Sequence, residues 1–146
     1  MLYLGADHRG FKLKEKLKVW LDGKKIKYQD LGAKKLDPAD DFPDVAQKVA
    51  QAVAKSKGRG VLLCGSGAGV AMAANKIKGI RAAIGFNPQQ VKSMRQDDNA
   101  NVLCLAADYV SKFKAFQLVK VFINTEFAEK ERYLRRLQKI SQLEQK

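Results

Sequence analysis

Apolar and polar residues follow two patterns along this chain, short apolar runs and helical spacing, and the two patterns alternate. Short apolar runs predict five β-strands, at residues 2–7, 25–32, 59–67, 80–86 and 99–108. Apolar residues at helical spacing predict helices between and after them, within residues 12–25, 37–58, 69–79, 88–97, 111–127 and 128–146. Because strand and helix alternate strictly, the pattern indicates a three-layer α/β fold with a parallel sheet.

The last of these helices differs from the others in its narrow apolar stripe. Its apolar positions are 134, 137, 140 and 143, and most of the rest is charged or polar. A stripe of that width packs against one neighbour only, which is either the chain's own domain or a second subunit reached by a protruding arm. The sequence contains no linker and no internal repeat, so residues 1–146 are expected to form one domain.

Composition and length are typical of a globular protein that is stabilised by its own hydrophobic core. The chain has 146 residues, of which 46% are hydrophobic and 29% charged, which is enough to bury a core without disulfides or metals. No run approaches the roughly 18 apolar residues of a membrane span, and glycine and charge come too early for a signal peptide. We therefore expect a cytoplasmic protein whose two cysteines, Cys64 and Cys104, are reduced.

The formal net charge of +13 favours anionic partners of some kind. Its lysines and arginines are spread along the chain, and much of this charge is the ordinary solvated surface of helices. Aromatic residues make up only 8% of the chain, and no RNP-like or zinc-finger pattern is present. These features argue against a nucleic-acid binder, although charge alone names no partner.

The stretch "CGSGAG", from Cys64 to Gly69, is the strongest chemical signal of the chain. Its three glycines permit backbone conformations in which several N–H groups point inward and form a nest for a phosphate or an oxyanion. The stretch is no P-loop, because the Lys-Ser/Thr pair is absent, and it is a poor dinucleotide fingerprint, because no acidic residue ends the next strand.

Three interpretations of Cys64 compete at this point: a buried packing residue, a redox thiol, or a base or nucleophile. The chain has no CxxC pair, which disfavours thioredoxin-type chemistry. A nest of amides next to the thiol favours the thiolate, and this supports the base or nucleophile. Cys104 lies inside an apolar strand, and we interpret it as packing.

Ligands of open parallel sheets bind outside the carboxyl ends of the strands, so polar residues at strand ends are candidates. Asp7 and His8 follow the first strand, and residues 97–101 adjoin the fifth. His8 is the only histidine, and it is either functional or a turn cap. One histidine and no paired-cysteine spacing predict a site without a metal, and no cofactor is expected.

Five segments together resemble a known family. In chain order they are "GADHRGFKLKEKL", "DDFPDVAQKVA", "LLCGSGAGVAMAANKIKGIRAA", "RQDDNANVL" and "ERYLRRLQKI". They are similar to the type B ribose-5-phosphate isomerases, a family that includes the galactose-6-phosphate isomerase subunits. The resemblance implies a Rossmann-like fold and a metal-free interconversion of aldose and ketose phosphates. It also implies a homodimer or homotetramer whose active sites lie at a subunit interface.

The resemblance further implies a role for each candidate. Cys64 is the base that moves a proton between C1 and C2 through a cis-enediolate, and Ser66 shuttles the proton between the two oxygens. The enediolate oxygens are held by backbone N–H groups of the loop, at Gly65, Gly67, Ala68 and Gly69. The remaining expected substrate contacts are Asp7, His8, Asn75 and Asn99 for the sugar and Arg132 and Arg136 for the phosphate.

The chain departs from the family pattern at four positions: Asp97 stands for a ring-opening histidine, Asp108 for a phosphate-binding arginine, Phe42 for a tyrosine and Tyr133 for a histidine. Asp97 could donate the ring-opening proton if it stays protonated, which adjacent Asp98 favours. We expect isomerisation of ribose 5-phosphate to ribulose 5-phosphate. The alternatives are a different substrate, such as a hexose phosphate, or a sugar-phosphate-binding protein with weak or no catalysis.

Overall fold

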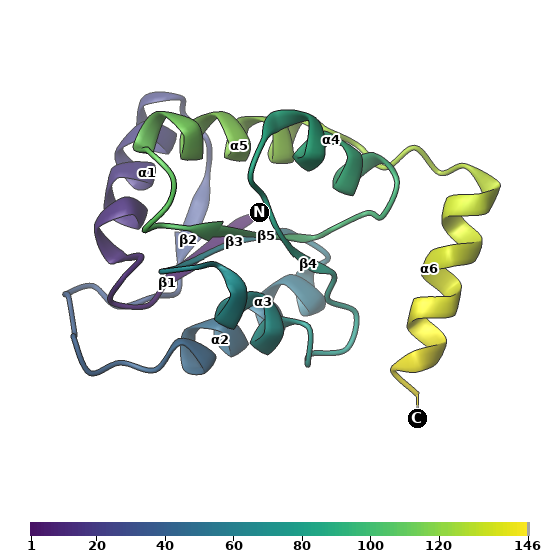
Figure 1. The fold of residues 1–146 in the computed structure, drawn as a ribbon, viewed down its shortest axis with the longest axis horizontal. Coiled ribbons are helices and arrows are strands. Elements are labelled where there is room, and N and C mark those ends of the chain that lie inside the picture. Colours follow the sequence, from purple (N-terminus) through teal and green to yellow (C-terminus); the bar gives the residue numbers. More distant parts are fainter. Residues whose placement is uncertain (146) are drawn as a thin grey trace.

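Five parallel strands form the single sheet of this protein, seen in a computed structural model that describes residues 1–145 (Figure 1). The strands, in chain order, are β1 (Leu2–Ala6), β2 (Tyr28–Asp30), β3 (Arg59–Cys64), β4 (Ala82–Ile84) and β5 (Val102–Ala106). Their order across the sheet is β2-β1-β3-β5-β4, and every neighbouring pair is parallel. The expected five-stranded parallel sheet is confirmed.

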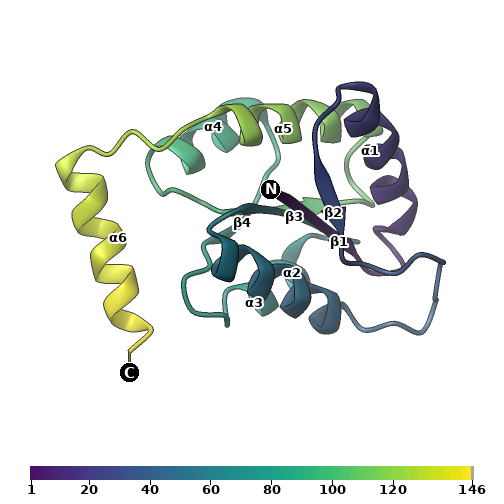
Figure 2. The same cartoon turned by 180° about the vertical axis from the view of Figure 1, so that it is seen from behind.

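Helices cover both faces of this sheet and complete the expected three layers. One face carries α1 (Phe11–Gly23), α4 (Pro88–Gln96) and α5 (Lys112–Asn124), and the other carries α2 (Phe42–Ser56) and α3 (Ala68–Ala74). The sixth helix, α6 (Glu131–Leu143), stands away from the body in both views (Figures 1 and 2). The C-terminal helix therefore protrudes, as an arm would.

The pleat of the central strand explains its continuous apolar sequence. Val61 and Leu63 of β3 pack in the cluster beneath α1, α4 and α5, whereas Leu62 and Cys64 pack in the cluster against α2 and α3. Both faces of β3 are thus covered, which is why the strand has no polar side chain after its first residue, Arg59.

The boundaries differ from the sequence expectation mainly at the two edge strands. β2 and β4 each keep only three residues of the longer apolar runs, as is common for strands that expose one edge. Asp41 is the N-cap of α2 but makes no side-chain capping bond. The last residue of the expected C-terminal helix, Lys146, lies outside the described residues. Within residues 1–145, no helix is long and apolar enough to cross a membrane.

The direction in which successive strands are added across the sheet reverses between β1 and β3. β1 is followed by β2 on one side, and the remaining strands all lie on the other side. Such a switch point leaves a crevice at the carboxyl ends of the two strands, where α/β proteins bind ligands.

A buried lysine ties α1 to the edge strand β2. Lys14 has a fully buried side chain, and its Nζ lies 2.5 Å from Oδ2 of Asp30 and 3.0 Å from the Ala33 carbonyl oxygen. Burial alone would raise the pKa of Asp30, but hydrogen bonds from Lys14 and Lys18 outweigh it and hold that pKa below its ordinary value.

We expect Asp30→Ala to destabilise the protein by about 3 kcal/mol, because it removes the nearer counter-charge of the buried Lys14 ammonium and leaves only Glu15, at 3.3 Å. Lys14→Met should cost much less, because Asp30 keeps Lys18 at 3.0 Å and the Gly32 N–H at 2.9 Å. Since the pKa of Asp30 is depressed in the folded state, its stabilising effect is present above the ordinary carboxyl pKa. It is lost as the pH falls through the folded value.

Urea unfolding of both variants between pH 3 and 7 measures these effects. Equal losses for Asp30→Ala and Lys14→Met, or an unchanged acid dependence in Asp30→Ala, would contradict the assignment.

Candidate functional site

The crevice at the switch point collects the first group of expected site residues. β1 leads directly into Asp7 and His8, and β3 ends at Cys64. Because Ala6 pairs with Leu63 in register, the two turns leave the sheet side by side. We call Asp7, His8, Cys64 and the loop 65–69 the base group.

Asp7 shapes the turn that presents His8. Its side chain is 5% exposed, and Oδ1 accepts N–H bonds from Arg9 at 2.9 Å and Gly10 at 3.0 Å. The Asp7 N–H donates to the Leu63 carbonyl oxygen at 3.2 Å. Asp7 thus fixes the turn to β3.

His8 is held by a carboxylate that arrives from the loop before α2. Oδ1 of Asp40 lies 2.7 Å from Nδ1 of His8 and accepts the His8 backbone N–H at 2.9 Å. The hydrogen bond to Asp40 raises the pKa of His8, and Asp7 adds to the effect, while burial opposes it. The imidazole is therefore oriented through Nδ1 and held closer to its cationic form.

Cys64 lies at the start of the glycine loop, and its sulfur, at the edge of an apolar cluster, meets one backbone N–H. The thiol is 4% exposed, and Sγ accepts the Gly67 N–H at 3.2 Å. Gly67 makes this possible through a left-handed backbone, with φ of 76°. The Ala68 N–H donates to Oγ of Ser66 at 3.3 Å. A donated N–H stabilises negative charge on sulfur, as a thiolate base requires.

Two side chains lie over the glycine loop, so closely that a Cβ on the glycine beneath either of them would displace it. A Cβ at Gly69 would lie 2.8 Å from the ring of Phe42, and a Cβ at Gly65 would collide with the guanidinium of Arg9. Arg9 is in turn paired with Asp108, which follows β5.

A second group gathers near the end of α4 and the start of α6. It contains Asp97, Asp98, Arg132 and Arg136. Asp97 is the C-cap of α4, and its charge adds to the raised pKa of Arg132, whose largest cause is the hydrogen bond to Tyr133. Burial and Asp97 raise the pKa of Asp98, and Arg136 opposes this shift. We call this set the arginine group.

The expectation that residues 97–101 adjoin the carboxyl edge of the sheet is wrong. Asn101 immediately precedes Val102, which pairs with Gly60, whereas Cys64 pairs with Ala106. Along the strand direction, Asn101 and Cys64 are therefore separated by the length of β5, roughly 15 Å at 3.3 Å per residue. A parallel strand enters at the amino edge, so residues before β5 and after β3 lie at opposite ends. One chain therefore holds the base group and the arginine group apart.

Asn75 and Asn99 both have their side chains engaged by this chain. Nδ2 of Asn75 donates to the Ala82 carbonyl oxygen at 2.9 Å, and Oδ1 of Asn75 accepts the Ala82 backbone N–H at 2.8 Å. These two bonds extend the pairing of the edge strand β4. Asn99 has a φ of 48°, and its Oδ1 accepts Nη1 of Arg95 at 2.9 Å.

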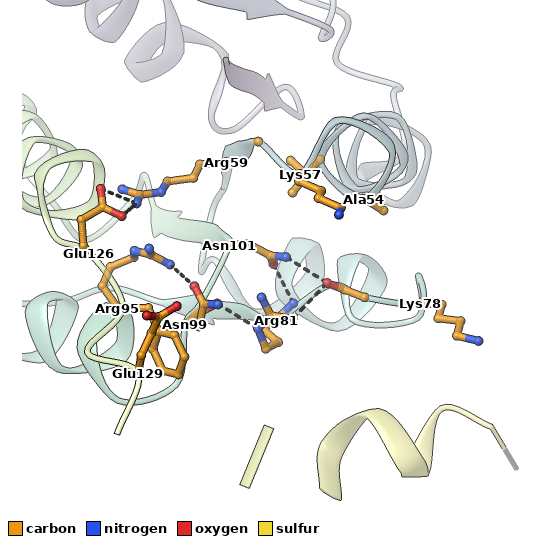
Figure 3. A pocket seen from close by; sticks show the side chains of 14 residues that line it. Ala54, Lys57, Arg59, Lys78, Arg81, Arg95, Asn99, Asn101, Glu126 and Glu129 are labelled. Atoms are coloured by element: carbon orange, nitrogen blue, oxygen red, sulfur yellow. Dashed lines mark hydrogen bonds and ion pairs between the residues drawn. The ribbon is translucent and has the colours of Figure 1, made fainter. Parts of the chain in front are cut away.

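Asn99 lines a cleft of about 540 Å³ at the amino edge of the sheet, shown in Figure 3. Arginines cluster there, but their N–H groups are engaged within the chain. Arg59 donates to the carbonyl oxygens of Phe122 and Ile123 and pairs with the Glu126 carboxylate, and Arg95 donates to the carbonyl oxygens of Thr125 and Ala100. Burial, with the charges of Arg59 and Arg81, lowers the pKa of Arg95 to about 10, although Glu126 opposes this. These arginines hold loops together.

The base group contains the kinds of groups that transfer protons and stabilise an oxyanion. It combines a thiol, backbone N–H groups, a hydroxyl and an oriented imidazole. Within the described part of the chain, no three His, Cys, Asp or Glu side chains could share a metal ion. Burial raises the pKa of the other thiol, Cys104, which lies in the core as expected for a packing residue.

Arg9 and Asp40 are parts of this site that the sequence did not assign to it, and Asp108 was expected there only as the replacement of a phosphate-binding arginine. Asp40 sits among several acids before α2, so no spacing singles it out. Arg9 follows the expected Asp7–His8 pair directly, and its charge next to the site was the available signal.

Comparisons with known proteins agree with one another. The family model described as "Ribose/Galactose Isomerase" matches residues 2–140. The chain is similar to the probable ribose-5-phosphate isomerase B of Mycoplasma pneumoniae, at 41% identity over 95% of this chain and 91% of that one. It is also similar to the D-erythrulose-4-phosphate isomerase 2 of Mycolicibacterium smegmatis, at 37% identity over 86% and 85% of the two chains.

A solved structure matches over the whole fold. It is the crystal structure of ribose-5-phosphate isomerase B from Mycoplasma genitalium with bound ribulose-5-phosphate, with a TM-score of 0.93 and 38% identity. The match covers 99% of this chain and 96% of that chain.

Because His8 is the only histidine, its titration can be followed by a single pair of imidazole NMR signals. We expect its pKa to lie above the ordinary value of 6.5 and to fall in Asp40→Asn, which removes the anionic partner. Asp44→Asn, which removes an acid from the first turn of α2, is the matched control and should leave the titration where it is. A midpoint at or below 6.5 in the unaltered protein, or equal midpoints in both variants, would contradict the role of Asp40.

Proposed function

Because this chain belongs to the ribose/galactose isomerase family, we propose that it interconverts a phosphorylated aldose and ketose, with ribose 5-phosphate and ribulose 5-phosphate as the substrate pair. The observation that carries the proposal is the position of Cys64, at a switch point, with its sulfur next to the glycine loop and accepting the Gly67 N–H. The M. genitalium relative, with its bound ribulose-5-phosphate, supports the choice of sugar.

In this mechanism the Cys64 thiolate removes the proton from C2 of the open-chain aldose and returns it to C1. Negative charge develops on the C1 oxygen, where backbone N–H groups of residues 65–69 stabilise it. Ser66 transfers the remaining hydroxyl proton from the C2 oxygen to the C1 oxygen, which leaves a carbonyl at C2. Asp7 and His8 hold the sugar hydroxyls, and no metal enters any step.

The arginine group completes the site from a second copy of the chain. Within one chain it lies too far from Cys64 to share a substrate, but α6 protrudes and exposes Leu134, Ile140 and Leu143 by 49%, 44% and 65%. An apolar stripe of this kind suits a second subunit, in a homodimer or a larger assembly. The partner subunit's Arg132 and Arg136, four residues apart on one helical face, then bind the phosphate.

Ring opening falls to the acidic pair of the arginine group. The partner subunit's Asp97 takes the place of the family's histidine. The raised pKa of its neighbour Asp98 keeps a proton at that pair more readily than on an isolated carboxyl. The M. smegmatis relative is named for a smaller sugar, D-erythrulose 4-phosphate. This name supports one alternative to ribose 5-phosphate as the substrate, namely another phosphorylated sugar.

Incubation with ribose 5-phosphate tests the reaction directly, with ketose formation as the readout. We expect turnover in the unaltered protein and a loss of kcat of at least about 100-fold in Cys64→Ala, because the proton-transfer base is gone. Cys104→Ala is the matched control and should keep kcat within a few-fold. Equal rates for Cys64→Ala and the unaltered protein would exclude Cys64 as the base. Turnover of other sugar phosphates alone would exclude ribose 5-phosphate.

Subunit mixing tests the shared site. Cys64→Ala and the double variant Arg132→Ala/Arg136→Ala should each be inactive, but a mixed dimer regains one intact site. After random exchange we expect about a quarter of full activity. Native mass spectrometry verifies that hybrids form. Hybrids without activity would show that the base and the arginines do not act from different chains.

A further inference from the structure

Arg9 lies against the loop that carries the proposed base. It follows His8 in the turn after β1, and its backbone N–H is held by Asp7 at 2.9 Å. Its guanidinium rests on Gly65, the residue after Cys64, so closely that any side chain at position 65 would collide with it. Arg9 is thus a direct neighbour of the site.

Asp108 holds this guanidinium in place and is itself attached to the same loop. The Asp108 N–H donates to the Gly65 carbonyl oxygen at 3.1 Å, and the adjacent Ala107 N–H donates to that of Cys64 at 2.8 Å. Its carboxylate accepts Nη2 of Arg9. Both side chains remain partly exposed, Arg9 by 53% and Asp108 by 37%. An exposed ion pair of this kind contributes little to the stability of the fold. Its main effect is to fix the orientation of the Arg9 guanidinium.

The charges around the crevice explain why the orientation of Arg9 matters for a phosphorylated substrate. The base group and its immediate partners include three carboxylates, Asp7, Asp40 and Asp108, which together would repel a phosphorylated substrate. Arg9 is the permanent cation among them, joined by His8 when that is protonated. A guanidinium has five N–H donors in a planar fork, and Asp108 occupies one Nη group, so other donors can pair with phosphate oxygens.

The direction of Arg9 separates it from the reacting carbons. The Cys64 side chain packs toward α2 and α3, whereas Arg9 lies in the turn that leads into α1, which covers the opposite face of the sheet. Arg9 therefore lies on the other side of the loop from the sulfur. This position suits the phosphate end of the substrate.

We infer that Arg9 binds the phosphate of the sugar phosphate at Cys64, and that Asp108 is a positioning residue that orients Arg9. The inference rests on the proposed function for the identity of the substrate. It assigns the phosphate a cation from the chain that carries the base, in addition to the arginine group.

Calorimetric binding of ribose 5-phosphate, together with steady-state kinetics, tests Arg9. We expect Arg9→Ala to raise Kd and KM about tenfold with kcat changed much less, since one charge-assisted phosphate contact is lost. Arg9→Lys should recover part of the affinity. Lys16→Ala removes one exposed charge from nearby α1 and is the matched control, expected to bind as the unaltered protein does. Values of Kd and KM within twofold of the unaltered protein in Arg9→Ala would overturn the inference.

The double variant separates the two roles of the pair. In Arg9→Ala the Asp108 carboxylate is left without its partner and repels the phosphate, so Arg9→Ala/Asp108→Ala should bind more tightly than Arg9→Ala. Asp108→Ala alone should weaken binding, but less than Arg9→Ala does, because the guanidinium stays but loses its orientation. Tighter binding by Asp108→Ala than by the unaltered protein would overturn the positioning role.

Failure of this inference and failure of the proposed function are distinguishable. If the unaltered protein binds ribose 5-phosphate without turnover, the isomerase proposal fails and the Kd series still decides Arg9. Turnover with an unaffected Arg9→Ala variant overturns the inference alone. No binding by the unaltered protein overturns both.

Discussion

The parallel pairing of β3 with β1 and β5 is the constraint on which the rest of this structure depends. It brings the turns after β1 and β3 together at one edge, so that Asp7, His8 and Cys64 become neighbours although more than fifty residues separate them. The same pairing sends the segment before β5 to the opposite edge. A parallel sheet therefore creates both the base group and its distance from the arginine group. In the proposed assembly, the protruding α6 allows a second copy to close that distance.

Periodicity was sufficient to predict the layers and the number of strands, and it left two arrangements open for the last helix. Those features follow from which residues can be buried, and burial leaves a direct trace in the sequence. The edge strands β2 and β4 came out shorter, because their apolar runs continue into turns without a partner strand on one side. Asn75 illustrates what periodicity does not reveal: its amide extends the pairing of β4 through two bonds to Ala82.

The candidate site was predictable where it depends on consecutive residues, as in the loop from Cys64 to Gly69. It was not predictable where it depends on contacts between distant segments. The pair of His8 with Asp40 spans 32 residues, and the pair of Arg9 with Asp108 spans 99. The acid at position 108 looked like a defect in a phosphate site when only the sequence was considered. Beside Arg9 it becomes part of a paired, oriented cation, which is why departures from a family pattern need their spatial partners before they are interpreted.

The central claim is that a sugar phosphate binds with its reacting carbons at Cys64 and its phosphate between arginines of two chains. A crystal structure with bound ribose 5-phosphate tests it most directly. The account predicts C1 and C2 beside the Cys64 sulfur, with the phosphate contacting Arg9 of that chain and Arg132 and Arg136 of another. A sugar phosphate held in the cleft lined by Arg81 and Arg95, or one whose phosphate meets arginines of a single chain only, would contradict it.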